Sequence, residues 1–419
     1  MKTILTLASI ALAVPLLVAQ STPSSQPISS WVQMTAAGAQ LRVIVPNGSA
    51  CPVARIHGKP LPLALRAEPE HASPDFPATC QVTLPSTAKH VTVDGRFMPI
   101  PGRVVRKIVV IGDTGCRVTG GEQQDCSQDW PFEKIASFAA AQHPDLVIHV
   151  GDYYYREKCE GGAKHCENWE NWRRDFFDPA HNLLNAAPWV FARGNHETCA
   201  RAAQGWFRYL DAADAPIPCL HAKSAAFLVP LQGLTLDVLD TADTPDAWLA
   251  DRKLQSFQQD IKPLHVSTGT PQWIITHKPP FVQGFMNPKF DGKATESDPN
   301  MPGVELILAG HLHLFGSMNF GPDRPGQLIV GDSGTRLMVS ASDLDKKLSA
   351  KNPKTMMENK SEIDGKQADV TMKGRFGYFI LERATPTAKL WKGSFHGIDD
   401  TVMAHCTIEG REVHCAPAK

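Results

Sequence analysis

The stretch Val147-Ile148-His149-Val150-Gly151-Asp152-Tyr153-Tyr154-Tyr155 begins as a mainly apolar, β-branched run and stops abruptly at a glycine and an acid. Such a run predicts a buried strand of an α/β protein. In these folds, ligands bind at the carboxyl ends of the strands. Asp152 has two carboxylate oxygens, so it could bridge two metal ions, and Tyr155 is close enough in sequence to return to one of them.

The composition is that of a globular protein. The chain has 419 residues, 42% of them hydrophobic, and a formal net charge of −1. This length supplies a full core and favours more than one domain. The near-neutral charge gives no reason to expect nucleic acid or an anionic membrane as a partner.

The beginning of the chain and its cysteines indicate export, to the periplasm or the extracellular space. Residues 1–20 are typical of a secretory signal peptide, and the Ser- and Pro-rich residues 21–30 of a flexible leader. The apolar run is short for a membrane span, so no anchor is expected after signal removal. The 10 cysteines therefore favour disulfides.

Five local disulfides are expected, because the cysteines fall into sequence neighbours. The expected pairs are Cys51–Cys80, Cys116–Cys126, Cys159–Cys166, Cys199–Cys219 and Cys406–Cys415. A zinc site is the alternative, although no pair has the tight Cys-x-x-Cys spacing of structural zinc.

The sequence pattern changes at a linker over residues 99–102. Before it, residues 31–102 hold β-branched segments separated by Pro, Gly and Asn, which predicts a small N-terminal β-sandwich. After it, residues 106–419 alternate strands with helices, the latter expected at 130–142, 168–185 and 247–261. Early crossovers and later hairpins predict an α/β sandwich of two sheets covered by helices. The Lys- and Asp-rich residues 340–373 are expected to form a solvated surface excursion.

Five loops carry oxygen or imidazole side chains directly after an apolar run. The candidate metal ligands are Asp113, Asp152, Tyr155, Asn195, His277, His311 and His313. This mixed set suits Fe, Mn or Zn and suits Ca poorly. A single histidine after a strand is usually structural, but five such loops in order are hard to explain in that way.

The five loops resemble the signature of the calcineurin-like metallophosphoesterases, and within them the purple acid phosphatases. The matching motifs, within residues 106–334, are Gly112-Asp113-Thr114-Gly115, Gly151-Asp152-x-x-Tyr155, Gly194-Asn195-His196-Glu197, Ile274-x-x-His277 and Gly310-His311-x-His313. Gly115 replaces a histidine usual in the superfamily, and Tyr155 restores the missing ligand, as in purple acid phosphatases.

This resemblance implies a four-layer α/β/β/α metallophosphoesterase sandwich with two metal ions. The first ion would be held by Asp113, Asp152, Tyr155 and His313, and the second by Asp152, Asn195, His277 and His311. The tyrosine implies Fe(III) at the first site, with Fe(II), Zn(II) or Mn(II) at the second.

The implied reaction is metal-assisted hydrolysis of a small-molecule phosphate ester. His196 would bind the phosphate and protonate the leaving alkoxide, and Glu197 would orient it. The expected enzyme is an exported acid phosphatase acting on monoesters, with a phosphodiesterase or nucleotide phosphatase as the alternative. The loops that follow the motifs add candidate substrate contacts, namely Arg117, Lys164, His165 and Arg193.

Two other functions compete. Gly331-Asp332-Ser333-Gly334 resembles the nucleophile segment of trypsin-like serine proteases, so a serine protease at Ser333 is a remote alternative. That chemistry needs a positioned His and Asp and two small β-barrels, whereas this chain has helical crossovers. A non-catalytic exported binding protein with the same fold is the second alternative, although no ligand position is missing. The oligomeric state is open.

Overall fold

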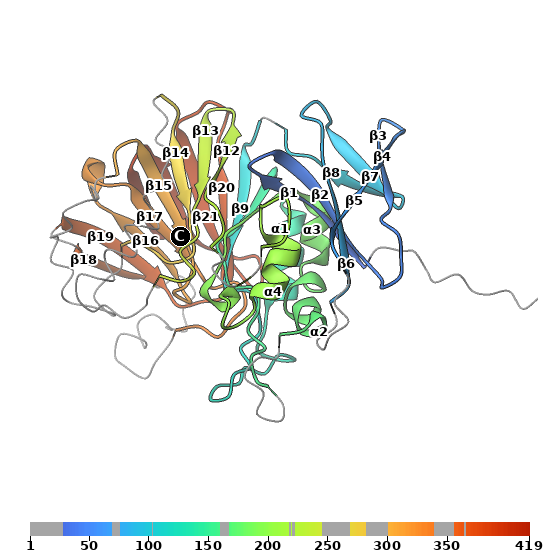
Figure 1. Ribbon diagram of the computed structural model, residues 1–419. Coiled ribbons are helices and arrows are strands. Elements are labelled where there is room, and N and C mark those ends of the chain that lie inside the picture. Colours follow the sequence, from blue (N-terminus) through green and yellow to red (C-terminus); the bar gives the residue numbers. More distant parts are fainter. Residues whose placement is uncertain are drawn as a thin grey trace, which may run out of the picture.

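Two large β-sheets lie face to face and carry the fold (Figure 1). The computed structural model describes residues 28–68, 76–102, 104–159, 167–217, 219, 223–244, 269–281, 301–338, 356–363 and 366–419. The predicted α/β sandwich is confirmed. Residues 1–27 and 247–261, where a signal peptide with its leader and a helix are expected, lie outside the described residues.

The first sheet has the strand order β23-β22-β21-β20-β9-β10-β11-β1-β2-β6-β5. Its strands are β1 Ser29–Thr35, β2 Gly38–Val45, β5 Ala64–Ala67, β6 Ala78–Thr83, β9 Lys107–Ile111, β10 Leu146–His149, β11 Trp189–Phe191, β20 Gly377–Glu382, β21 Leu390–Gly397, β22 Val402–Glu409 and β23 Glu412–Pro417. Strands β9, β10 and β11 are parallel neighbours, so their carboxyl ends share one edge.

The second sheet has the order β12-β13-β14-β15-β17-β16-β19-β18. Its strands are β12 Phe227–Leu231, β13 Leu234–Val238, β14 Gln272–Ile275, β15 Val304–Ala309, β16 Phe315–Asn319, β17 Gly326–Val330, β18 Met357–Ile363 and β19 Lys366–Lys373. A third, small sheet joins β4 Lys59–Pro62, β3 Val53–Ile56, β7 His90–Val93 and β8 Arg96–Pro99.

Apolar side chains hold the layers together on both faces of the first sheet. Ile108 and Val110 of β9 point toward the second sheet, where Leu236 and Leu308 belong to the same core. Residues 109 and 111 point the other way, into a core shared with the helices. A strand buried on both faces explains why its sequence reads as an unbroken apolar run.

Short helices cover the outer face of the first sheet (Figure 1). They are α1 Phe132–Ala141, α2 Trp169–Trp172, the π-helix η2 Arg173–Phe177, α3 His181–Ala186, the 3₁₀ turn η3 Asn195–Glu197, α4 Ala203–Gly205 and the π-helix η4 Trp206–Leu210, while the 3₁₀ turn η5 Gly321–Asp323 precedes β17. In α1 the buried residues recur with helical spacing, which is the stripe that a helix packed on a sheet requires.

One expectation is changed by the structure. Residues 366–373 were expected in an irregular excursion, but they form β19, which pairs antiparallel with β18. The side chains of this segment alternate with the period of two of a strand, because Ala368, Val370 and Met372 are buried between polar residues. The N-terminal strands are joined to the first sheet, because β1 pairs with β11. A domain boundary near residue 102 stays a prediction.

Four of the expected disulfides are confirmed: Cys51–Cys80, Cys116–Cys126, Cys199–Cys219 and Cys406–Cys415. The fifth includes Cys166, which lies outside the described residues. Two of the four close loops that border the metal-ligand motifs. The last one links β22 to β23 at the edge of the first sheet.

Two buried arginines fasten the N-terminal strands to the helical layer. Arg42 of β2 donates to the Tyr209 carbonyl at 2.6 Å, and Arg66 of β5 donates to the Phe207 and Arg208 carbonyls, each at 2.9 Å. These carbonyls belong to η4, where backbone acceptors at a helix end need outside donors. The N-terminal segment therefore completes the backbone hydrogen bonding of η4.

Replacing Arg42 with methionine should lower the free energy of unfolding by about 2–3 kcal/mol, because a buried carbonyl loses its charged donor. Denaturant unfolding of the two proteins measures the difference. Arg55→Met is the matched control, since Arg55 donates to Gly58 on an exposed turn. A loss for Arg42→Met no larger than that of the control would show that the η4 carbonyls find other donors.

Candidate metal centre

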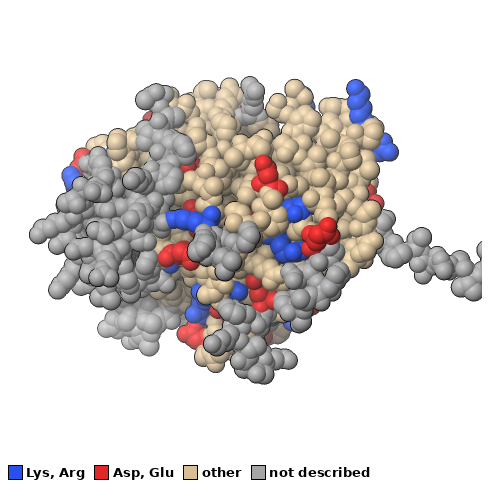
Figure 2. All heavy atoms as spheres, in the orientation of Figure 1, with Lys and Arg blue, Asp and Glu red and all other residues tan. Residues whose placement is uncertain are grey.

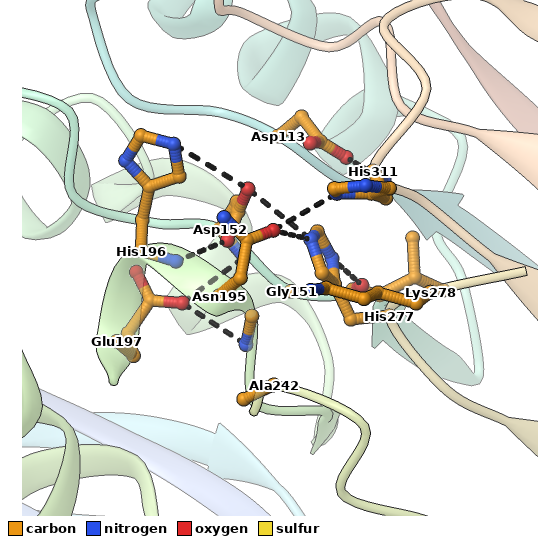
Figure 3. Close-up of polar contacts among 12 residues, drawn as sticks. Asp113, Gly151, Asp152, Asn195, His196, Glu197, Ala242, His277, Lys278 and His311 are labelled. Atoms are coloured by element: carbon orange, nitrogen blue, oxygen red, sulfur yellow. Dashed lines mark hydrogen bonds and ion pairs between the residues drawn. The ribbon is translucent and has the colours of Figure 1, made fainter. Parts of the chain in front are cut away.

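The candidate ligands follow the carboxyl ends of parallel strands from both sheets. Asp113 follows β9, Asp152 and Tyr155 follow β10, Asn195 follows β11, His277 follows β14, and His311 and His313 follow β15. In the sandwich these loops converge, and Figure 3 shows Asp113, Asp152, Asn195, His277 and His311 turned toward one another. All seven sequence-predicted ligands are thus brought to one place, although they come from strands up to 200 residues apart.

One group of side chains surrounds the phenol oxygen of Tyr155. This oxygen lies 3.1 Å from Oδ1 of Asp113, 2.8 Å from Oδ2 of Asp152 and 3.0 Å from Nε2 of His313. The four residues are the set expected to hold the first ion.

A second group surrounds the amide oxygen of Asn195. This Oδ1 atom lies 2.9 Å from Nε2 of His277 and 2.9 Å from Nδ1 of His311. Nε2 of His277 is also 3.2 Å from Oδ2 of Asp152. Asp152, His277 and His311 offer ligand atoms that all lie within 4.8 Å of one another. Asp152 is the residue that both groups share.

Backbone carbonyls fix two of the imidazoles from behind. Nδ1 of His277 lies 2.8 Å from the Val150 oxygen, and Nδ1 of His313 lies 2.8 Å from the Arg336 oxygen. A carbonyl only accepts, so each Nδ1 carries the proton and each Nε2 is left as the electron-pair donor that faces the centre. The donor set therefore fits cations.

The electrostatics of the group favour a bound cation as well. Burial opposes charge on Asp152, but His277 and His196 outweigh it and hold the pKa of this carboxyl well below its usual range. Burial and the carboxylates of Asp152 and Asp113 raise the pKa of Tyr155 well above its ordinary value. The phenol can become a phenolate ligand in this setting only beside a strong positive charge.

Strained backbone accompanies the ligands. Asp113, Asp152 and His311 have φ of 54°, 61° and 68°, in the left-handed region that residues with a side chain seldom adopt. Such conformations cost about 1–3 kcal/mol each, so the surrounding contacts must hold them. The Asp113 and Thr114 N–H groups donate to the Gly151 and Asp152 carbonyls, both at 2.9 Å. This pairing locks the loops of β9 and β10 together.

Glu197 is buried, and its carboxylate binds the backbone of these loops. Its carboxylate accepts N–H bonds from Asp152 at 3.1 Å, Tyr153 at 2.8 Å, Tyr154 at 3.1 Å and Gly194 at 3.0 Å. The expectation that Glu197 orients His196 is therefore wrong, because both of its oxygens are taken by backbone groups. Glu197 instead fixes the backbone that carries Asp152, the residue shared by both groups.

The chain matches the calcineurin-like phosphoesterase family over residues 106–315, about half of its length. It belongs to this family. The phosphoesterase is therefore a hydrolase of phosphoester bonds, in a family that uses two metal ions. A comparison with curated proteins finds no match.

Solved structures show the same fold. A purple acid phosphatase, PPD1 from yellow lupin (Lupinus luteus) seeds, is similar with a TM-score of 0.57 and 10% identity, over 94% of this chain and 74% of that one. PhoD is similar with a TM-score of 0.50 and 13% identity, over 94% and 93% of the two chains. Identities this low show a shared fold alone.

His196 of the phosphoesterase lies beside both groups of ligands. Its backbone N–H donates to Oδ1 of Asp152 at 2.9 Å, and its Nε2 is 3.9 Å from the other carboxylate oxygen. Its ring lies against that of Tyr155, with centroids 3.7 Å apart and the planes tilted by 34°. The imidazole thus faces the centre without being part of either group (Figure 3).

The structure places the other candidate substrate contacts differently. Arg117 lies at the site, with its guanidinium carbon 5.9 Å from the centre of the Tyr155 ring. Arg193 does not contact the exterior, because it is 1% exposed and pairs with Asp240 at 3.1 Å. Lys164 and His165 lie outside the described residues.

Ser333 does not have the surroundings of a protease nucleophile. Its hydroxyl is buried, donates to the Gly377 carbonyl at 2.9 Å and accepts from the Gly112 N–H at 3.3 Å. The Gly331–Gly334 loop instead supports the loop of Asp113, because the Ser333 N–H donates to the Gly112 carbonyl at 3.1 Å, and the following Thr335 N–H donates to the Asp113 carbonyl at 2.8 Å.

Sequence reasoning missed two acids near the centre. Asp175 of η2 is fully buried and accepts N–H bonds from Tyr155 at 2.8 Å and Arg156 at 3.1 Å. It also pairs with the Arg156 guanidinium at 2.6 Å. Glu157 lies beside His196. For Asp175 the available signal was an acid within an aromatic stretch that is expected to be helical. Nothing in the sequence distinguishes Glu157.

Replacing Gly194 with alanine should reduce activity and metal content by about tenfold or more, the loss typical of disturbed outer contacts. A Cβ at this position would lie 2.1 Å from Oδ1 of Asp152 and 2.2 Å from its backbone nitrogen. Phosphate release and metal analysis of the purified variant give the readouts. Gly120→Ala is the control, since a Cβ there meets nothing within 4 Å. Equal behaviour of the two variants would contradict the close fit.

Along the described residues, no helix is long and apolar enough to cross a membrane. On the face shown in Figure 2, acidic and basic side chains of the described residues are interspersed.

Proposed function

We propose that this phosphoesterase is an exported acid phosphatase that hydrolyses phosphate monoesters with two metal ions. The observation that carries the proposal is the phenol oxygen of Tyr155 between Asp113, Asp152 and His313, at 2.8–3.1 Å from each. A tyrosine among carboxylates and an imidazole favours Fe(III) at this first site. Asp152, Asn195, His277 and His311 would hold Fe(II), Zn(II) or Mn(II) at the second.

When bound, the two cations supply a hydroxide nucleophile and neutralise charge on the phosphoryl oxygens. The residues of the chain provide the rest. Asp152 stands between the two sites and fixes their spacing. His196, beside Asp152, protonates the leaving alkoxide. Arg117 places a cation next to Tyr155, where it contacts the phosphate of the incoming ester.

Export is supported by the disulfides. Four bridges are formed among the described residues, as is typical of proteins in an oxidising compartment. Two of them, Cys116–Cys126 and Cys199–Cys219, belong to loops that follow Asp113 and Asn195. They stiffen the borders of the site, on which the orientation of His196 and Arg117 depends.

The proposed activity is tested by comparing rates on a chromogenic phosphate monoester and the matching diester from acidic to mildly alkaline pH. A preference for the monoester with an acidic optimum is expected. A preference for the diester at or above neutral pH would replace the proposal by a phosphodiesterase on the same site. Asp152→Asn is the control, because removing the shared ligand should abolish metal binding and both activities.

The iron is tested by the colour of the purified protein. A phenolate on Fe(III) should give a visible charge-transfer band, which Tyr155→Phe should abolish. Tyr154→Phe is the matched control, because the neighbouring hydroxyl accepts from Asn171 at 3.2 Å instead of facing the centre. A band that survives in Tyr155→Phe, or a colourless wild-type protein filled with zinc or manganese, would contradict the assignment of Fe(III).

A further inference from the structure

Three side chains on the outer face of the first sheet are hydrogen-bonded in series. Oγ of Ser394 lies 2.9 Å from Nε2 of His396, and Nδ1 of the same imidazole lies 2.8 Å from Oδ1 of Asp400. The first two residues belong to β21, and the aspartate belongs to the turn that leads to β22. Their partners on β20, Ile380 and Tyr378, belong to the core under the helices. None of the three is a candidate metal ligand, so the phosphatase mechanism does not use this row.

The hydrogen bonds fix the position of each proton in the row. A carboxylate only accepts, so Nδ1 of His396 carries the proton that it donates to Asp400. Nε2 of the neutral ring is then an acceptor, and the Ser394 hydroxyl donates to it. This is the order of nucleophile, general base and orienting acid that activates a serine hydroxyl, and it is recognised by its geometry on unrelated folds.

The base and the acid are both held in place by their neighbours. A β-bulge at Phe395 and His396 interrupts the pairing of β21 with β22, and such a bulge re-aims a side chain. The ring of Tyr378 stacks on the imidazole, with centroids 5.1 Å apart and the planes at 29°. The hydroxyl of the same tyrosine donates to Asp400, and Nε2 of Gln142, at the end of α1, donates to its Oδ2 at 3.2 Å.

The serine is the member of the row that a substrate can approach. His396 is buried, with 8% of its surface exposed, whereas Ser394 is only half-buried. His405 stands directly opposite Ser394 on β22, and its side chain is exposed. Cβ atoms of residues paired in this way are about 5 Å apart, so an N–H of His405 can reach the carbonyl oxygen of a group bound to Ser394. The cross-strand imidazole is therefore the donor for an oxyanion.

We propose that Ser394, His396 and Asp400 form a second hydrolytic centre, which acts on small carboxylic esters without the metal ions. Oγ of the serine bonds to the carbonyl carbon while Nε2 of the histidine takes the hydroxyl proton. The bond to the alcohol oxygen breaks, and that oxygen takes the proton from Nε2. Water then attacks the acyl-serine and gives a proton to Nε2, and the acid departs as Oγ regains this proton. A single imidazole donor favours esters whose alcohol leaves easily.

Hydrolysis of 4-nitrophenyl acetate by the full-length protein tests the centre, and a metal chelator should not change the rate. Ser394→Ala and His396→Gln should each lower this rate by about a hundredfold or more, because the nucleophile or its base is lost. Metal content should stay that of the wild type, which shows that the variants are folded. Ser127→Ala is the matched control, since it removes an exposed hydroxyl that donates to Asp125 at 2.6 Å, and the rate should not change.

A fluorophosphonate probe gives a second readout that does not depend on turnover. Ser394 should displace fluoride from the probe, and mass spectrometry of the labelled peptide identifies the serine. His396→Gln retains the hydroxyl but should lose the label, which separates an activated serine from one that is only accessible. Absence of label at Ser394, equal labelling of His396→Gln, or wild-type ester hydrolysis no faster than that of Ser394→Ala would overturn the inference. The row would then serve only to fasten the turn after β21 to α1.

Discussion

The Asp152 carboxylate belongs to two groups of candidate ligands at once, and much of the surrounding structure holds it in that position. Its backbone adopts φ of 61°, directly after Gly151 at φ of 103°. A buried acid, Glu197, holds its N–H, and the absence of a side chain at Gly194 leaves room for its oxygens. Gly194 and Glu197 lie on the loop after β11 of the first sheet, whereas His277, whose Nε2 is 3.2 Å from Oδ2 of Asp152, follows β14 of the second sheet. Both sheets must therefore be in register before the carboxylate can be placed.

The elements that could be predicted are those whose local sequence pattern matches the burial that the fold gives them. The strand that ends at Gly151 reads as buried because it is covered on both faces, and the five ligand motifs could be placed because each follows such a strand. β19 was missed because its apolar residues alternate with polar ones in a Lys-rich stretch. The pairing of β1 with β11 and the contact of Glu157 with His196 join residues distant in sequence, which leave no local pattern.

Buried acids with a raised pKa make the folded state more stable at low pH. Burial raises the pKa of Glu167 to about 7, against N–H bonds from the Trp172 indole at 2.7 Å and Gln204 at 3.0 Å. A carboxyl whose pKa is higher in the folded state binds its proton more tightly there. Its contribution to stability is complete below its unfolded value of about 4.5 and is lost as the pH rises through about 7. This direction is compatible with the acidic optimum proposed for the enzyme.

The place of β1 in the first sheet has a consequence for the order in which the chain can fold. Strands β1, β2, β6 and β5 are made first, yet β1 finds its parallel partner only when β11 has left the ribosome. Until then one edge of this early hairpin unit is open, and an open edge invites pairing with other chains. Arg42 and Arg66 likewise wait for the η4 carbonyls. The N-terminal strands are thus synthesised well before the strand and the helix that secure them, and an edge that stays exposed in this interval favours aggregation.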